Sequence, residues 1–251
     1  MNKEHQITAS IVLYNQNINV LKKTVTSFLN TPFKKKLFLI DNSKNNQVKD
    51  ILKSNEIEYV FTGKNIGFGK AHNLILNKIQ SDFHLILNPD VAFSPDIILA
   101  LMNQLLQNKE VSFITPKVIY PDKSLQYVCR KHPTLFNLIN RNLKIFKRLA
   151  LKNQYSDSDL NKPFYPDFIH GCFMLFKTED FKILNGFDER YFLYMEDADL
   201  CRKIDRSGKK IMYFPEVNII HQHQKGSFKS LKLFFYHISS AIKYFLKWGF
   251  R

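Results

Sequence analysis

Cysteine is scarce in this sequence and poorly placed for a structural role. The 251 residues contain three, Cys129, Cys172 and Cys201. Their number is odd, they lie far apart, and no two of them form a C-x-x-C pair. This pattern argues against a disulfide framework or a cysteine-ligated zinc site, and it indicates a reducing cytoplasm.

Long apolar segments are missing as well. No uninterrupted apolar run approaches the ~20 residues that a membrane-spanning helix needs. Residues 1–6 lead into a strand-like run without the apolar core of a signal peptide. We therefore expect a protein that is either soluble or peripheral on a membrane.

Acidic residues are outnumbered by basic ones. The chain has 22 Asp and Glu against 37 Lys and Arg, a formal net charge of +15, and residues 123–156 and 217–251 contain no acid. Such an excess favours an anionic partner, either nucleic acid, an acidic membrane surface or a phosphorylated small molecule. Lysines that are simply solvated are the alternative.

The remaining composition is that of one globular α/β domain. With 45% hydrophobic residues, the chain suits a domain of roughly 200 to 250 residues with a small C-terminal appendage. Strand-like runs alternate with helical patterns, which predicts a mostly parallel sheet covered by helices on both faces. The predicted strands are 7–14, 37–40, 57–61, 83–87, 111–120 and 217–220, and the predicted helices are 21–29, 48–53, 70–79 and 135–151, with a loop at 156–167.

Polar residues follow several of the predicted strands. Asn15, Asp41, Asn65 and Asp90 each come just after one. The carboxyl ends of parallel strands form the edge where such sheets bind ligands, so these side chains should share one rim. Asp90 also ends an Asn-Pro-Asp turn, where a carboxylate suits Mg²⁺ or Mn²⁺ on nucleotide phosphates. A turn merely capped by aspartate is the alternative.

Residues 63–70 form a glycine-containing loop before a predicted helix. They match neither nucleotide fingerprint, because G-x-x-x-x-G-K needs glycine where Phe68 stands, and G-x-G-x-x-G fails after Gly69. Free amides of such a loop could still approach a nucleotide or diphosphate.

An acid cluster, Glu196, Asp197 and Asp199, lies within residues 191–200, a segment typical of a helix start. Crowding can raise the pKa of one carboxyl toward that of a general base, and an acid-rich helix N-terminus is the alternative. Farther on, His221 and His223 complete no zinc set, so at most one joins an oxygen-rich site and solvated loop histidines are the alternative.

The C-terminal residues 228–250 predict a basic amphipathic helix. It either packs on the domain or lies on an anionic membrane. The expected apolar face consists of Leu231, Phe234, Phe235, Ile238, Ile242 and Phe245, and the lysines mostly on another face are Lys229, Lys232, Lys243 and Lys247.

These motifs, in this order, resemble those of the family-2 inverting glycosyltransferases, and within them of the rhamnosyltransferase-like branch. The resemblance runs from about residue 7 to residue 227. The matching segments are Ile11-Val12-Leu13-Tyr14-Asn15, Ile40-Asp41-Asn42-Ser43, Asn65-Ile66-Gly67-Phe68-Gly69, Leu87-Asn88-Pro89-Asp90, Gly171 to Leu175, Gly186-Phe187-Asp188-Glu189, Phe192 to Leu200, and Ile220-His221.

The resemblance implies the GT-A fold, an α/β architecture with a Rossmann-like, mostly parallel central sheet flanked by helices. It also implies a single domain over residues 1–227, with a nucleotide-binding half over about 1–120 and an acceptor-side half over about 121–227. The basic amphipathic helix, residues 228–251, would follow this domain.

The resemblance also implies residue roles. Asp41 and Asn42 would recognise the donor base, and Mg²⁺ or Mn²⁺ would be held by Asp90 and His221. Asp197 would be the general base, positioned by Glu196 and Asp199. Further donor-binding residues would be Tyr14, Asn15, Asn65, Gly67, Phe68 and Asn88.

Two departures from the family pattern stand out. Asn88 replaces an acid of the fuller metal motif, which leaves fewer charged ligands, although this branch commonly has asparagine there. The residues between His221 and Ser227 are not Gly-rich as is usual in this branch, so the role of His223 stays open.

The leading hypothesis is metal-assisted transfer of rhamnose from dTDP-rhamnose to a surface polysaccharide or lipid-linked oligosaccharide. The enzyme would be cytoplasmic, either free or peripheral on the inner face of the membrane through its C-terminal helix, with no nucleic-acid partner. The same reaction with another UDP- or dTDP-sugar is the first alternative. A sugar-phosphate nucleotidyltransferase would need a Gly-rich, Arg-containing loop after the first strand, and residues 14–17 offer none. A non-catalytic polyanion or membrane-surface binder would explain the charge but not the ordered acids.

Overall fold

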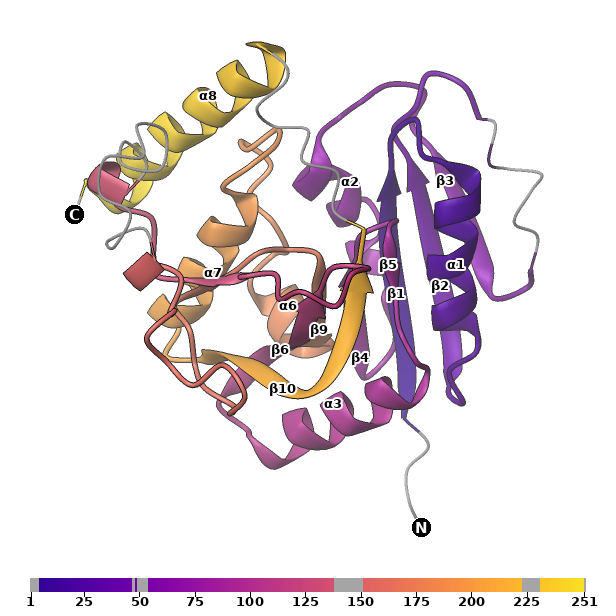
Figure 1. The fold of residues 1–251 in the computed structure, drawn as a ribbon. Coiled ribbons are helices and arrows are strands. Elements are labelled where there is room, and N and C mark those ends of the chain that lie inside the picture. Colours follow the sequence, from indigo (N-terminus) through magenta and orange to yellow (C-terminus); the bar gives the residue numbers. More distant parts are fainter. Residues whose placement is uncertain (1–4, 47, 49–53, 138–150, 223–230, 251) are drawn as a thin grey trace.

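The computed structural model describes residues 5–46, 48, 54–137, 151–222 and 231–250. These residues form one large sheet with helices packed against it (Figure 1). The strand order is β3-β2-β1-β4-β9-β6-β10-β5. The strands are β1 (Gln6–Leu13), β2 (Lys34–Asp41), β3 (Ile57–Phe61), β4 (Phe83–Leu87), β5 (Val91–Ala92), β6 (Val111–Ile119), β9 (Phe173–Lys177) and β10 (Lys210–His221).

The sheet is mostly parallel, as predicted. β1 pairs in parallel with β2 and β4, β2 with β3, and β6 with β10. β9 runs antiparallel between β4 and β6, and β5 runs antiparallel to β10. The strand order reverses between β1 and β4, so ligands are expected above the carboxyl ends of these strands. A separate two-stranded ribbon joins β7 (Cys129–Arg130) to β8 (Phe168–Ile169).

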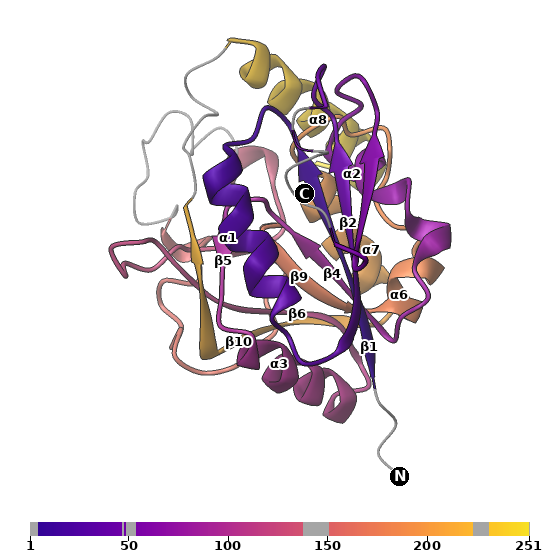
Figure 2. The ribbon, with the colours of Figure 1, turned by 90° about the vertical axis from the view of Figure 1, so that its right-hand side faces the viewer.

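Helices cover both faces of the sheet (Figure 2). In this view α1 and α3 lie on one face, and α2, α6 and α7 lie on the other. Helix α8 lies above α7 in the view of Figure 1 and ends near the chain's C-terminus. The helices are α1 (Ile18–Leu29), α2 (Phe68–Asn73), α3 (Asp96–Gln107), α6 (Thr178–Ile183), α7 (Glu196–Arg206) and α8 (Leu231–Trp248).

Two predicted helices begin or end elsewhere. The helix predicted over 70–79 divides into α2 and a 3₁₀ turn at Leu76–Lys78, because the backbone tightens to i→i−3 bonds at Leu74 and Ile75. Helix α7 begins at Glu196 rather than near residue 191, because left-handed φ angles of 69° and 68° at Tyr194 and Met195 interrupt a helix. Most of the helix predicted over 135–151 lies outside the described residues, as do most of that over 48–53 and His223; residues 135–137 and 151 are helical.

The core is continuous across the sheet, and the three cysteines are buried within it as free thiols. Among the described residues, no helix has the length and apolarity that crossing a membrane requires. Helix α8 packs on the protein through Ser240, Tyr244 and Phe245, so the interpretation that it contacts the domain is confirmed. Five of the six residues of the predicted apolar face are exposed, however, so most of that face points away from the core: Leu231, Phe234, Phe235, Ile238 and Ile242.

Candidate active site

Hydrogen-bonded side chains line the ends of β1, β2 and β3. Asp41, the last residue of β2, is fully buried and accepts bonds from the Tyr59 hydroxyl (2.6 Å) and the Ser43 amide (2.9 Å). The Ser43 hydroxyl accepts the Asn15 amide at 2.8 Å, with Asn15 in the left-handed region (φ 49°). The structure thus brings together Asp41 and Asn15, as predicted from their places after the strands. The adjacent Tyr14 is exposed.

Asn42 and Asn65 also meet at this rim. The Asn42 amide donates to the Gly67 carbonyl at 3.0 Å and approaches Asn65 Oδ1 at 3.5 Å. Thr62 donates to Asn42 Oδ1 at 3.1 Å. The asparagines are therefore fixed by the loop after β3.

The glycine-containing loop serves a contact that its sequence did not suggest. The Gly67 amide donates to Asn65 Oδ1 (3.0 Å) and the Phe68 amide to the Phe192 carbonyl (3.1 Å), so neither amide is free for a diphosphate. A Cβ on Gly67 would lie 2.5 Å from the Phe192 oxygen, and φ at Gly67 is 97°. Only glycine fits this close approach between the loop after β3 and the residues before α7. The ring of Phe68 packs on Phe187.

The predicted metal ligands face each other. Asp90 lies between β4 and β5, and antiparallel pairing of β5 with β10 sets His221 opposite Val91. As a result His221 Nε2 lies 3.2 Å from Asp90 Oδ1. Asn88, predicted beside them, is half-buried.

Gln126 determines how His221 is oriented. The side-chain nitrogen of Gln126 donates to the His221 carbonyl at 2.6 Å. The side-chain oxygen, Oε1, lies 3.0 Å from His221 Nδ1 and can only accept a hydrogen bond from it. Nδ1 therefore carries a proton, and Nε2 faces Asp90. Burial lowers the pKa of His221, but Cys172 and Asp90 outweigh it and raise this pKa to about 10.

The donor set fits a hard divalent cation that is only partly held by protein. One carboxylate and one imidazole nitrogen converge, and Gln126 fixes the tautomer in the way typical of ligating histidines. No group of three His, Cys, Asp or Glu side chains suited to a metal occurs in the described part of the chain. The diphosphate of a bound nucleotide would have to supply further oxygens, and His221 would have to lose its Nε2 proton.

Backbone contacts connect this pair to the acid cluster. The Asn88 amide donates to the Cys172 carbonyl at 2.9 Å. The neighbouring Gly171 amide donates to Asp197 Oδ2 at 3.2 Å. The turn after β4, the residues before β9 and the start of α7 are therefore contiguous, and Asp90 and Asp197 border the same part of the rim.

Asp197 stands at the first turn of α7 as a partly accessible carboxylate. Its side chain is 16% exposed, and its Oδ1 accepts the Ala198 amide at 2.8 Å. His170 Nδ1 lies 3.5 Å from Oδ2. A carboxylate in the first turn of a helix interacts favourably with the helix dipole.

Glu196, next to it, differs in protonation. It is buried, and its Oε2 has no hydrogen-bond partner among the described residues. Burial first, and then the charge of Asp197, raise the pKa of Glu196 well above its ordinary value. The carboxyl with the raised pKa is thus Glu196, the buried neighbour of Asp197.

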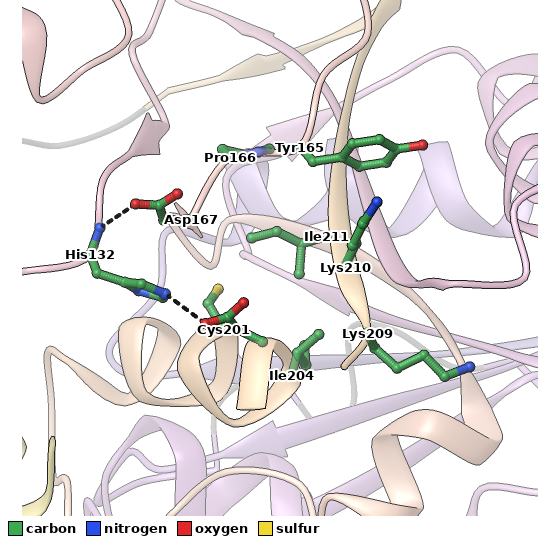
Figure 3. A pocket seen from close by; sticks show the side chains of 10 residues that line it. His132, Tyr165, Pro166, Asp167, Cys201, Ile204, Lys209, Lys210 and Ile211 are labelled. Atoms are coloured by element: carbon green, nitrogen blue, oxygen red, sulfur yellow. Dashed lines mark hydrogen bonds and ion pairs between the residues drawn. The ribbon is translucent and has the colours of Figure 1, made fainter. Parts of the chain in front are cut away.

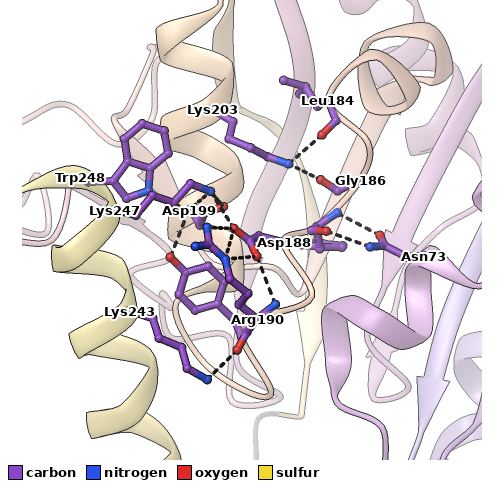
Figure 4. A network of polar contacts seen from close by, with 12 residues as sticks. Asn73, Leu184, Gly186, Asp188, Arg190, Asp199, Lys203, Lys243, Lys247 and Trp248 are labelled. Atoms are coloured by element: carbon purple, nitrogen blue, oxygen red, sulfur yellow. Dashed lines mark hydrogen bonds and ion pairs between the residues drawn. The ribbon is translucent and has the colours of Figure 1, made fainter.

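Asp199 lies in a charged network beside α8 (Figure 4). It is fully buried, and it binds Lys247 Nζ at 2.8 Å and accepts bonds from Trp248 Nε1 (2.7 Å) and the Tyr191 hydroxyl (3.1 Å). Lys247 also pairs with Asp188 at 2.8 Å. These contacts anchor α8, whereas the sequence suggested that Asp199 positions Asp197.

A cavity of about 330 Å³ lies elsewhere, between the later turns of α7 and the start of β10 (Figure 3). Its lining includes none of the predicted site residues, so it is not the candidate active site. The lining residues are His132, Tyr165, Pro166, Asp167, Cys201, Ile204, Asp205, Lys209, Lys210 and Ile211.

Four residues in these contacts were missed by the sequence reasoning: Tyr59, Thr62, Gln126 and His170. Tyr59 and Thr62 come from β3 and the position after it, and only the parallel pairing with β2 brings them to Asp41. Gln126 is 95 residues from its partner His221. His170 precedes Gly171 in a recognised motif, which was the one available signal.

Comparisons with known proteins agree with this geometry. A family model described as "Glycosyl transferase family 2" matches residues 8–183. A second model, "N-terminal domain of galactosyltransferase", matches residues 156–229.

Two curated relatives and one solved structure show the same similarity. The chain is 31% identical to "Rhamnosyltransferase WbbL" of Escherichia coli over 83% of this chain and 81% of that protein. It is 27% identical to "N-acetylglucosaminyl-diphospho-decaprenol L-rhamnosyltransferase" of Mycobacterium tuberculosis over 72% of this chain and 64% of that one. The crystal structure of GalNAc-T7 with UDP, GalNAc and Mn²⁺ superposes with a TM-score of 0.69 at 14% identity, covering 88% of this chain and 44% of that one.

Proposed function

The chain belongs to glycosyl transferase family 2 and is a glycosyltransferase of the GT-A fold, and from this premise we propose that it transfers rhamnose from dTDP-rhamnose. The proposed acceptor is a surface polysaccharide or lipid-linked oligosaccharide. Both curated relatives carry rhamnosyltransferase names, and the mycobacterial name specifies a diphospho-decaprenol acceptor. Another UDP- or dTDP-sugar donor is the alternative.

The proposed reaction is direct displacement at the anomeric carbon. Asp197 removes the proton of the acceptor hydroxyl while the hydroxyl oxygen forms a bond to the anomeric carbon. The bond from this carbon to the nucleotide diphosphate breaks on the opposite side. Glu196 provides a buried neighbour whose pKa is raised. Asp41, Asn42, Asn65 and Asn15 bind the nucleoside, with Tyr14 and Asn88 bordering it.

The leaving group carries charge that must be neutralised. Mg²⁺ or Mn²⁺ would supply Lewis-acid stabilisation of the departing diphosphate. In this chain Asp90 and His221 would hold the ion, and Gln126 would keep His221 in the required tautomer. The observation that carries the proposal is the contiguity of the Asp90–His221 pair with Asp197 through Asn88, Cys172 and Gly171.

Donor identity can be tested by thermal shift in the presence of Mn²⁺. A ligand that binds only the folded state raises its stability in proportion to the logarithm of concentration. We expect dTDP-rhamnose to raise the melting temperature more than dTDP, UDP-sugars or GDP-sugars. If another sugar nucleotide raises the melting temperature more, that sugar nucleotide is the donor and not dTDP-rhamnose.

The metal assignment can be tested separately. Asp90→Asn should weaken Mn²⁺ and donor binding, and chelator should abolish transfer by the unaltered protein. Calorimetric titration of Mn²⁺ in the presence of dTDP measures the first effect. If Asp90→Asn and the unaltered protein bind Mn²⁺ equally, Asp90 is not a ligand.

The exposed face of α8 fits an anionic bilayer, where a lipid-linked acceptor would lie. Leu231, Phe235 and Leu246 are 79%, 65% and 73% exposed. Residues 217–251 contain six basic residues and no acid. Two of them, Lys243 and Lys247, bond to the protein, and the charge of the other four complements an anionic membrane surface. We propose that α8 attaches the enzyme peripherally to the inner face of the cytoplasmic membrane.

Vesicle sedimentation tests this attachment. Phe235→Ser with Leu246→Ser should reduce binding to phosphatidylglycerol-containing vesicles by roughly 100-fold, from the apolar area lost. Ile183→Ser, an exposed residue of α6, is the matched control and should bind normally. If the double variant binds vesicles normally, or instead dissociates a dimer, the face does not bind lipid.

A further inference from the structure

We propose that His170 is a positioning residue for Asp197, fixed in one tautomer by Arg130. The inference rests on the proposed role of Asp197 as the base. His170 is not among the site residues predicted from the sequence.

The two-stranded ribbon of β7 and β8 brings these residues together. Cys129 pairs with Ile169, and the His170 amide donates to the Val128 carbonyl at 3.0 Å. This pairing places Arg130 Nε 2.9 Å from His170 Nε2. The opposite edge of the ring, at Nδ1, faces Asp197 Oδ2 at 3.5 Å.

The contact with Arg130 determines where the imidazole proton lies. Arginine has only donors, so His170 Nε2 must accept and carries no proton. The neutral ring then has its proton on Nδ1, directed at Asp197. Although a histidine beside a carboxylate often forms an ion pair, a second proton on His170 would here oppose the Arg130 N–H.

His170 would complete the set of donors around the Asp197 carboxylate. Oδ1 accepts the Ala198 amide and Oδ2 accepts the Gly171 amide. A third donor, from Nδ1, orients Oδ2 and leaves the remaining lone pairs for the acceptor hydroxyl. The 3.5 Å separation is long for a hydrogen bond, and such catalytic contacts commonly shorten when substrate binds.

Access is consistent with this role. The His170 side chain is 39% exposed while Asp197 is 16% exposed, so the ring covers part of the carboxylate without sealing it. His132 makes a useful contrast, because its Nε2 approaches Asp205, on a later turn of α7, at 3.7 Å.

Three substitutions separate the two ring nitrogens. The amide nitrogen of His170→Asn can take the place of Nδ1, that of His170→Gln reaches only the place of Nε2, and His170→Leu has neither. We expect kcat to stay within about threefold for Asn and to fall roughly 10-fold or more for Gln and Leu, the factor for losing a hydrogen bond to a charged group. The KM for the donor, and the rise in melting temperature that the donor causes, should be unchanged in all three variants. The control variant His132→Asn should retain full kcat.

Equal kcat in the Asn, Gln and Leu variants, with Asp197→Asn inactive, would overturn the role of His170 and leave the proposed function standing. A second readout does not depend on turnover. Nitrogen-15 NMR of the unaltered protein at neutral pH should show His170 protonated at Nδ1 alone, with this preference lost in Arg130→Met. A proton on Nε2 in the unaltered protein would also overturn the inference.

Discussion

The two sides of the start of helix α7 are built in opposite ways. On one side, Asp197 is partly exposed, accepts backbone amides and lies 3.5 Å from the His170 imidazole. On the α8 side, Asp199 is fully buried and is neutralised by Lys247. A carboxylate with neutral partners can take up a proton, whereas one paired with a buried ammonium is committed to the structure. Two aspartates two residues apart therefore have different roles.

The largest expected effect separates these aspartates. Asp197→Asn should lower sugar transfer by about 10²- to 10⁴-fold, because it removes the general base, with little change in stability. Asp199→Asn should lower the free energy of unfolding by about 3 kcal/mol and leave transfer per folded molecule nearly intact. Transfer assays combined with urea unfolding measure both. If the Asp199→Asn variant is stable but inactive, Asp199 acts in catalysis and not only in anchoring α8.

The next effect tests the anchoring side alone. Lys247→Met leaves Asp199 buried without its cation and should cost about 3 kcal/mol of unfolding free energy. Lys243→Met is the matched control one helical turn earlier, where the ammonium donates to the Arg190 carbonyl at the surface, and it should cost about 0.5 kcal/mol. Equal urea midpoints for the two variants would mean that Asp199 does not depend on Lys247.

The smallest effect, counted per pH unit, concerns Glu196 and appears only as a pH dependence. Its pKa is raised in the folded state, so the stability linked to its protonation is present below the unfolded pKa near 4.5 and is lost as pH rises toward the folded pKa. Between pH 5 and 8 the unaltered protein should lose stability relative to Glu196→Gln, by up to about 1.4 kcal/mol per pH unit. Parallel pH profiles of the urea midpoint would show that Glu196 is ionised in the folded protein.

The strands of the donor side could be predicted from the sequence because their signals are local. Residues 57–61 and 83–87 are short apolar runs ended by turn-forming residues, and both strands were confirmed. Asn15 comes shortly after β1 and Asp41 ends β2, so parallel pairing was enough to predict their proximity. The antiparallel part of the sheet could not be predicted from the sequence, because β5 has only two residues and its pairing with β10 depends on the fold.

The acceptor side depends on contacts that are distant in sequence. Composition does not distinguish Asp197 from Asp199. The difference lies in Lys247, which pairs with Asp199 and is 48 residues farther along the chain. The amphipathic pattern of α8 was real, but a helical wheel cannot show that two of its lysines, Lys243 and Lys247, face the protein. The late start of α7 follows from left-handed residues at 194 and 195 that carry no glycine signal.

The way α8 is attached limits what deletion mutagenesis can show. A chain shortened before residue 231 would lose Lys247 and Trp248 from Asp199, as well as the Ser240 hydroxyl that donates to the Leu193 carbonyl at 2.8 Å. Loss of membrane attachment in such a truncated form would report damage to the support of α7 as much as loss of a lipid contact. Point substitutions on the outer face of α8 separate the two, because they leave every one of these internal bonds in place.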